Sequence, residues 1–351
     1  MSILYMTGFE SACLDEFLYR KLNNVFYEIT DENKRTGNYS LHIYGSPSWF
    51  YIFLGNTSVT EIYVRVAVWP RHAFEYGYDS VGLDNSAIFT LFSSSGYELS
   101  TLAVGGSQVR LAVKGAGEIS SYIVGGIIRY KKWNVYELYG KIDNTNGVYI
   151  LKENGRVVGS YYGDTQPSSA YGARSDIASI KFGEGSTYQT ITPTAWGNLL
   201  GYYDDIMVRT DMWPGLGGIE ALSPTSDTAQ KDLLPSEGTD NYSLVNTIPH
   251  NDATYVHSVS TSHDLYEMSN ITLPGVVKGL RWSARGKLVT PGEAFYKRVF
   301  KINSTEYRSE NKSTDMEFSM IHDSVMTNPD TETDWTREDI DNIEVGVEIV
   351  K

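Results

Sequence analysis

The sequence predicts an all-β protein. Short segments in which apolar and polar residues alternate recur along the chain, and glycine- or asparagine-containing turns separate them. The 26 tyrosines and 32 glycines suit strands and tight turns better than helices. Strands at such short spacing are typical of a sandwich or barrel, and not of alternating strands and helices.

The clearest element is a three-stranded antiparallel meander at residues 133–163. In its first strand Tyr136 and Leu138 fall on one side and Glu137 on the other, which is the period of a half-buried strand. Asn154-Gly155 then predicts a two-residue hairpin, because a type I′ turn needs positive φ at both central positions.

Further strands are expected before and after this meander. In residues 61–68 the even-numbered side chains are apolar, and Glu61, Tyr63 and Arg65 share the other face. Pro70 is expected to end this strand, because proline cannot donate to a ladder. A single helical turn fits within residues 11–27. The other strands expected in this half lie at residues 3–9, 39–44, 88–93, 99–104, 109–113, 119–124 and 177–182.

The segment Trp-Pro-Gly-Leu-Gly-Gly at residues 213–218 marks a domain boundary, because proline and paired glycines are typical of linkers. We expect a domain at 1–212, a linker at 213–219 and a second domain at 220–351. In the second domain, residues 224–240 are polar and expected to be extended. Strands are expected at 280–285, 296–302, 316–321 and 343–349, with a capping box formed by Thr336 and Asp339.

Several turn motifs of the first domain occur together in one family. A tryptophan precedes a strand, Asp-Asn-Thr-Asn-Gly follows at 143–147, and Gly-Asp-Thr ends the meander at 163–165. Matching segments lie at 35–41 and 203–208. The pattern resembles concanavalin A-like, laminin-G-type jelly rolls, especially those of tailed-phage virion proteins. The resemblance implies that the strand at 3–9 pairs beside the closing strand near Asp205.

The second domain carries a resemblance of its own. Four blocks, at residues 222–227, 238–245, 249–256 and 334–347, occur in the expected order. Together they resemble the C-terminal β domain attached to many phage virion proteins. This resemblance implies a smaller β-sandwich-like domain for virion attachment or assembly, and no catalytic activity.

Charge and cysteine content exclude several classes of partner. The formal net charge is −14, and residues 213–351 carry 12 Lys and Arg against 22 Asp and Glu. Such a chain is repelled by phosphate, so no nucleic-acid partner is expected. Cys13 is the single cysteine, which argues against a secreted disulfide scaffold. No signal peptide or apolar run long enough for a bilayer is present, so no membrane partner is expected.

Catalytic signatures are missing from the sequence. No phosphate-binding P-loop, no zinc-protease His-Glu-x-x-His and no esterase Gly-x-Ser-x-Gly occurs. The glycosidase pattern Glu-x-Asp-x-x-Glu has one near match at 332–337, where Arg337 replaces the last carboxylate. We interpret that match as a turn leading into a helix cap. No catalytic, cofactor-binding or metal-ligating residue is assigned.

Two clusters in the sequence contain residue types that bind metals, and each also fits a simpler role. Asp204-Asp205 could contribute to a Ca²⁺ site, because Ca²⁺ takes several oxygen ligands, or could accept backbone N–H bonds at a strand. His250, His257 and His263 lie close in sequence, but their spacing matches neither a strand face nor a helix face. We interpret these histidines as surface or turn residues.

Aromatic side chains offer a possible sugar-stacking surface. The candidates are Trp49, Phe50 and Tyr51 on one segment, with Tyr161 and Tyr162 on another. Strand alternation sends at least one ring of each group into the core, so packing is the alternative role. Cys13 is interpreted as a small buried apolar residue.

Two functions from different classes follow from these observations. The first is a non-enzymatic structural protein of a tailed-phage particle, in its tail, collar or capsid appendage. Such a protein would contact other virion proteins, form homo-oligomers and be located in the virion after assembly in the host bacterial cytoplasm. The alternative is a carbohydrate-binding or carbohydrate-cleaving module that recognises a bacterial surface glycan.

Overall fold

A computed structural model describes residues 3–12, 27–44, 49–54, 59–72, 85–105, 108–114, 121–167, 175–183, 200–289 and 294–351. These residues divide into two compact units. The first takes in residues 3–9 and 27–219, and the second takes in residues 10–12 and 220–351. Strands are the dominant regular elements of both units, which confirms the all-β prediction.

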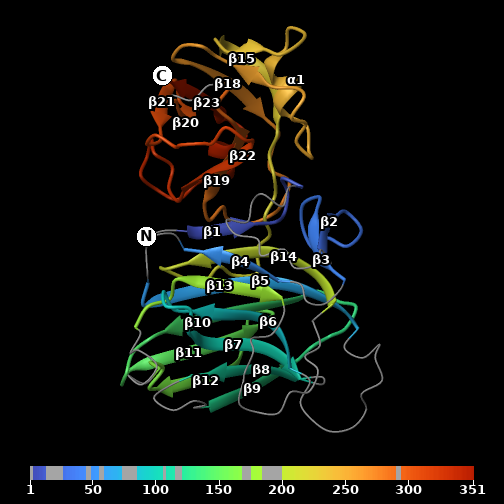
Figure 1. Ribbon diagram of the computed structural model, residues 1–351, viewed down its shortest axis with the longest axis vertical. Coiled ribbons are helices and arrows are strands. Elements are labelled where there is room, and N and C mark those ends of the chain that lie inside the picture. The colour runs from blue at the N-terminus through green and yellow to red at the C-terminus, as the bar shows by residue number, and fades with distance from the viewer. Residues whose placement is uncertain are drawn as a thin grey trace. The chain divides into compact units, whose positions relative to one another are not determined.

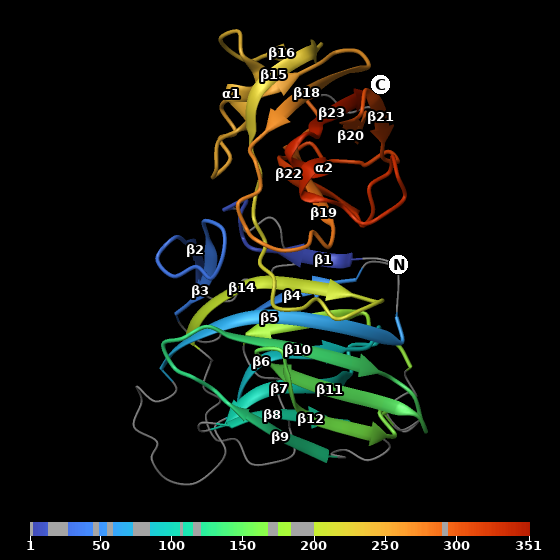
Figure 2. The same cartoon turned by 180° about the vertical axis from the view of Figure 1, so that it is seen from behind.

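The first unit is a sandwich of two antiparallel sheets (Figures 1 and 2). The larger sheet has eight strands in the order β12-β11-β10-β5-β14-β3-β2, and β1 also pairs with β14. Its strands are β1 (Ile3–Thr7), β2 (Tyr27–Thr30), β3 (Ser40–Ile43), β5 (Glu61–His72), β10 (Asn134–Lys141), β11 (Gly147–Glu153), β12 (Arg156–Gly163) and β14 (Leu200–Arg209).

The second sheet of this unit has six strands in the order β4-β13-β6-β7-β8-β9. They are β4 (Trp49–Phe53), β6 (Asn85–Phe92), β7 (Glu98–Gly105), β8 (Gln108–Val113), β9 (Ser121–Ile127) and β13 (Ser179–Gly183). Alternate side chains of both sheets fill the space between them, among them the fully buried Val64, Leu138, Leu91 and Phe182. This packing is that of a jelly-roll sandwich.

At one edge of the sandwich the two sheets approach each other closely. A Cβ added to Gly159 of β12 would lie 2.1 Å from the Cγ2 atom of Ile123 on β9. A Cβ on Gly125 of β9 would lie 2.4 Å from the carbonyl oxygen of Val158. Glycine is therefore required on both strands where the sheets meet.

The predicted meander and its hairpin are confirmed. β10 pairs with β11 and β11 with β12, all antiparallel. Asn154 and Gly155 have φ values of 48° and 81°, as a type I′ turn requires. The predicted pairing of the opening and closing strands is also confirmed, because Thr7 lies opposite Ile206.

Some strand boundaries were predicted wrongly. β5 continues past Pro70 to His72, because β10 has already left that edge of the strand at the Asn134–Val68 pair. A proline without an N–H is tolerated where one side of the strand is unpaired. The strand expected at 316–321 lies at 319–325, and the helical turn expected within 11–27 falls mostly on residues outside the described ranges.

The second unit contains one five-stranded antiparallel sheet and two strand pairs. The sheet has the order β15-β18-β23-β20-β21, and the pairs are β16-β17 and β19-β22. The strands are β15 (Pro224–Lys231), β16 (Leu234–Pro235), β17 (Val256–His257), β18 (Ser262–Met268), β19 (Leu280–Gly286), β20 (Phe295–Ile302), β21 (Thr305–Arg308), β22 (Ser319–Val325) and β23 (Glu344–Val350). Two short helices are α1 (Asn241–Val245) and α2 (Arg337–Asp341).

The last strand lies at the centre of this sheet. β23 pairs with β18 on one side and β20 on the other, so the strand expected at 343–349 is confirmed. Ile343, which directly precedes β23, belongs to a hydrophobic core with Trp282, Phe300 and Trp335. The predicted capping box is present, since the Thr336 side chain accepts from the Asp339 N–H and the Asp339 carboxylate accepts from the Thr336 N–H.

Candidate functional site

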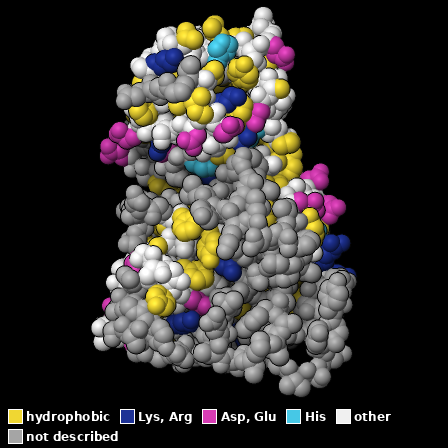
Figure 3. Space-filling model, viewed as in Figure 1, with side chains coloured by type: hydrophobic (Ala, Val, Ile, Leu, Met, Phe, Trp, Pro, Cys, Tyr) yellow, Lys and Arg dark blue, Asp and Glu magenta, His cyan; other side chains and the backbone are white. Residues whose placement is uncertain are grey.

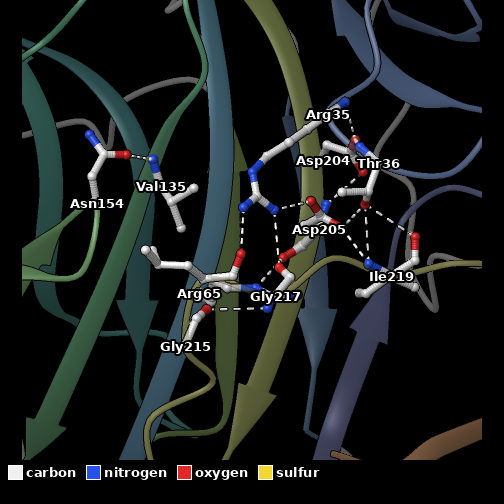
Figure 4. Close-up of polar contacts among 11 residues, drawn as sticks. Arg35, Thr36, Arg65, Val135, Asn154, Asp204, Asp205, Gly215, Gly217 and Ile219 are labelled. Atoms are coloured by element: carbon white, nitrogen blue, oxygen red, sulfur yellow. Dashed lines mark hydrogen bonds and ion pairs between the residues drawn. The ribbon is translucent and has the colours of Figure 1, made fainter. Parts of the chain in front are cut away.

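The Asp204-Asp205 pair lies at the centre of a buried polar cluster in the first unit (Figure 4). Both side chains are fully buried at a β-bulge in β14, where Asp205 has a φ of 50°. The Asp205 carboxylate accepts bonds from the Thr36 hydroxyl at 2.6 Å and the Ile219 N–H at 2.7 Å, and forms an ion pair with Arg35.

The neighbouring Asp204 carboxylate accepts three backbone N–H groups. They belong to Asp205 at 2.7 Å, Arg35 at 2.8 Å and Thr36 at 3.3 Å. Burial and the Asp205 charge raise the pKa of Asp204, against the lowering effect of these donors. All four oxygens of the pair are thus occupied by hydrogen-bond donors of the chain.

Two arginines extend this cluster to the segment that follows β14. Arg35 donates to the carbonyls of Leu216 and Gly217. Arg65, only 1% exposed, donates to the carbonyl oxygens of Asp205 at 2.9 Å and Gly215 at 3.3 Å (Figure 4). We call these contacts of residues 35–36, 65, 204–205 and 215–219 the clasp. The segment expected to be a linker is therefore hydrogen-bonded to the first unit.

The clasp accounts for Asp204 and Asp205 without a metal. In the part of the chain that the structure describes, no group of three or more His, Cys, Asp or Glu side chains could hold a metal ion. His250, His257 and His263 are all half-buried. His263 lies 3.5 Å from Glu306, and the ring of His257 lies 5.9 Å from that of Tyr255. Cys13 lies outside the described residues.

The near match to a glycosidase pattern is a structural turn, as predicted. Glu332 has a φ of 58° within this turn, and Thr336 caps α2. Trp335 between them is 2% exposed, and its indole N–H donates to the Val325 carbonyl at 3.1 Å. These residues form a turn, a helix cap and part of the core of the second unit.

One histidine that the sequence did not single out is strongly perturbed. His322 of β22 lies opposite Ser283 of β19, with 2.9 Å between its Nδ1 atom and the serine hydroxyl. Its Nε2 atom is buried and has no hydrogen-bond partner among the described residues. Burial, together with nearby Arg281, lowers the pKa of His322 to about 2.

This perturbation predicts that His322 stays neutral in the folded protein down to pH 4. The unfolded chain takes up the proton near pH 6.5, so the stability that His322 contributes is present above pH 6.5 and lost as the pH falls below it. NMR of the imidazole signals between pH 8 and 4 tests this. A His322 signal that titrates near pH 6.5 in the folded state, as it does in urea, contradicts it.

The aromatic residues predicted as a sugar-stacking surface separate in the fold. Phe50 is buried and stacks on Phe182 at 5.0 Å, whereas Tyr51 is half-buried on the outer side of β4, 5.6 Å from the ring of Phe53. A group of hydrophobic side chains is visible on the first unit in Figure 3. The Trp49 side chain lies outside what the structure describes.

Tyr161 and Tyr162 point to opposite sides of β12. The Tyr161 hydroxyl donates to the Asp164 carbonyl at 3.0 Å. Tyr162 is 69% exposed on the outer face of the eight-stranded sheet. Only one tyrosine of this pair is thus available to a ligand on that face.

The same outer face carries a cluster of three rings that sequence analysis missed. Tyr63 of β5 and Tyr139 of β10 lie directly opposite each other and stack at 4.7 Å between centroids. Trp213 packs edge-on against Tyr63 at 5.4 Å and lies 6.2 Å from Tyr139. All three rings are half-buried. We call Tyr63, Tyr139 and Trp213 the ring platform, and Figure 2 shows its strands β5 and β10 side by side.

Charged side chains surround the ring platform. The ammonium of Lys152 lies 3.5 Å from the centroid of the Trp213 ring. Tyr139 donates its hydroxyl to Glu61 at 2.8 Å, and burial with this carboxylate raises the pKa of Tyr139. The tyrosine is therefore a neutral donor whose partner is already fixed.

The platform combines features that recognise carbohydrates. Flat rings take the apolar face of a sugar, and charged or amide groups at the edge bond its hydroxyls. The sequence predicted one part of the platform, because the alternation in residues 61–68 placed Tyr63 on the outer face of its strand. The strand pairing that places Tyr139 opposite Tyr63, and the position of Trp213 against both rings, could not be read from the sequence.

Comparisons with known proteins give fold likeness only. No family model matches the chain, and no curated protein matches it. Similar solved structures include the binding domain of botulinum neurotoxin serotype G, 11% identical over 91% of this chain and 78% of that chain, with a TM-score of 0.37. No helix in the described ranges is long and apolar enough to cross a membrane.

Two further similar structures match about half of this chain. A carbohydrate esterase, vb_24B_21 from the Shiga toxin-encoding bacteriophage phi24B, is 13% identical over 53% of this chain and 87% of its own, with a TM-score of 0.35. Alginate lyase Aly36B is 13% identical over 51% of this chain and 83% of its own, with a TM-score of 0.31. Scores this low carry no argument about function.

Proposed function

We propose that this protein binds carbohydrate without cleaving it, and that the ring platform of the first unit is the binding surface. The observation that carries this proposal is the contact of Tyr63, Tyr139 and Trp213 on the outer face of a sheet. Three rings from separate parts of the chain form one half-buried apolar surface. Such a surface suits a sugar ring better than it suits a flexible apolar ligand.

We propose binding without cleavage because the carboxylates near the ring platform already accept hydrogen bonds from the chain. Glu61 accepts the Tyr139 hydroxyl, and Glu137 accepts the Gly215 N–H at 2.7 Å. Asp211 is held by Arg209 through two bonds of 2.8 and 2.9 Å. Acid–base cleavage of a glycoside needs a pair of carboxyl groups that face the scissile bond.

A glycan array with the full chain tests the proposal. We expect specific binding that weakens about tenfold, or about 1.4 kcal/mol, in Trp213→Ala and in Tyr139→Ala. Tyr97→Ala is the matched control, because Tyr97 is 42% exposed in the turn between β6 and β7 of the other sheet. Equal binding by all three variants contradicts the proposal, as does release of sugar from a bound glycan.

We also propose that the second unit attaches the protein to a tailed-phage particle, as a non-enzymatic structural component. The observation that favours this role concerns the residues that carry the resemblance of this unit to phage virion domains. Asp227, from the first block, accepts the N–H groups of Asn241 and Tyr242, from the second, at 2.9 and 2.7 Å. Residues of the first two blocks thus contact each other and stabilise the backbone of the second unit.

Imaging of purified particles tests this second role. The expected result is density for multiple copies of the chain on the particle, in contact with other virion proteins or with each other. Particles assembled with a chain that lacks residues 220–351 should lose the first unit as well. Particles that contain no copy of the chain contradict the role.

A further inference from the structure

We propose that the glycan bound by the ring platform is an anionic polysaccharide, with carboxylate or sulfate groups on its sugars. This inference rests on the proposed carbohydrate-binding function and names the class of ligand. It is drawn from two lysines, Lys141 and Lys152, that share the outer face of the sheet with the rings.

The two lysines lie on either side of the stacked tyrosines. Lys141 follows Tyr139 by two residues on β10 and therefore lies on the same face. Lys152 of β11 lies opposite Glu137, one outward position before Tyr139. Lys141 lies opposite Val148, so the two lysines are four residues apart along the strand direction, which corresponds to about 14 Å. Along the strands, the stacked tyrosine rings therefore lie between one lysine and the other.

Neither lysine forms a close ion pair, although the charge of Lys141 adds to the hydrogen bonds from Asn146 and Thr145 that lower the pKa of Asp143. Lys141 and Lys152 form no ion pair with any residue that the structure describes, and the one contact of the Lys152 ammonium is the face of Trp213. The nearby carboxylates of Glu61, Glu137 and Asp211 all accept hydrogen bonds from the chain. These three carboxylates therefore already have partners within the chain, whereas neither lysine has an ion-pair partner among the described residues.

The two lysines form a local cationic site on a chain whose formal net charge of −14 otherwise repels anions. A lysine kept beside an aromatic ring gains cation–π attraction, and an incoming anion at a partly desolvated site is bound more strongly than at an open surface. Neutral sugars would bond the same lysines only through hydroxyl oxygens. An acidic polymer adds an ionic contact at each end of the platform.

The exposed Tyr162 extends the surface across the strands, at the end of the platform where Lys141 lies. It lies opposite Val148, which lies opposite Lys141, so all three occupy one row across β10, β11 and β12. Tyr162 is 69% exposed on the same outer face. A chain of sugars can therefore contact the rings, the lysines and this outer tyrosine together.

Affinity electrophoresis of the full chain tests the inference with four polymers. The probes are polygalacturonate, its carboxyl-reduced neutral form, dextran sulfate and dextran. We expect retardation by an acidic polymer at least tenfold stronger than by its neutral counterpart, and weaker retardation as salt is added. Comparison of polygalacturonate with dextran sulfate shows which anionic group is preferred.

The decisive variant is Lys141→Gln/Lys152→Gln, with Lys131→Gln/Lys132→Gln as the control. The control removes two charges from the turn before the same meander, where both lysines are exposed. Loss of at least tenfold in the first double variant only, together with loss in Trp213→Ala, supports the inference. Equal binding of neutral and acidic polymers, lost in Trp213→Ala, overturns it and leaves carbohydrate binding intact.

Other outcomes also decide the question. If retardation by acidic polymers is equal in Trp213→Ala and in the wild type, the protein is a general polyanion binder and the inference is wrong. If none of the four polymers is retarded and the glycan array is also blank, the proposed function fails with it.

Discussion

Asp205→Asn is expected to destabilise the first unit by about 3 kcal/mol, because it removes the anion from a buried ion pair. The carboxylate of Asp205 accepts from Thr36 and Ile219 and faces the guanidinium of Arg35. An asparagine of the same shape must turn its NH₂ group toward at least one of these donors. Urea unfolding, followed by tryptophan fluorescence and fitted to the free energy of unfolding, measures the loss.

Asp31→Asn is the matched control for this measurement. It removes the same charge from an exposed residue in the turn after β2, where the carboxylate has no hydrogen bond or ion pair with the described residues. The expected change there is within about 0.5 kcal/mol. Equal unfolding free energies for the two variants mean that the clasp contributes no stability.

Local sequence signals were sufficient for most of the strands of the sandwich. The alternation in residues 61–68 and the Asn154-Gly155 turn depend only on neighbouring residues, and both predictions were correct. The resemblance to jelly rolls added the pairing of the first and last strands of the unit. Each of these features is determined by short-range chemistry or by a pattern of turns.

β18 was missed because its buried face is not apolar. Asp264 is fully buried, and its carboxylate accepts from the Leu233 N–H, the Asn241 side chain and the Tyr266 hydroxyl. Three hydrogen bonds make a buried carboxylate tolerable, but they leave no hydrophobic alternation in the sequence. This strand therefore depends on hydrogen bonds to residues that are distant along the chain.

The ring platform was missed for a related reason. Tyr63, Tyr139 and Trp213 come from separate parts of the sequence, and only the antiparallel register of β5 and β10 brings the two tyrosines opposite each other. Register depends on the whole sheet. Trp213 was assigned to a linker because glycine and proline follow it, whereas the clasp holds this segment against the sheet.

The clasp makes a further prediction about the extent of the first unit. A protein that ends at residue 212 should be less stable than one that ends at residue 219 by about 5 kcal/mol, from several lost hydrogen bonds and the lost packing of Trp213. Without residues 213–219, Arg35 and Arg65 lose carbonyl acceptors and Asp205 loses a backbone donor. Its melting temperature should be lower by at least about 10 °C.

Calorimetry of three proteins, ending at residues 212, 219 and 223, checks this. The third is the control: residues 220–223 belong to the second unit, and Glu220 accepts from Thr272 there, so they should add nothing to the first unit alone. Equal melting temperatures for the 212 and 219 proteins would show that the segment acts as a linker. A large gain between 219 and 223 would place the boundary later. The expected order, with 212 well below 219 and 219 equal to 223, follows from hydrogen bonds that end at Ile219.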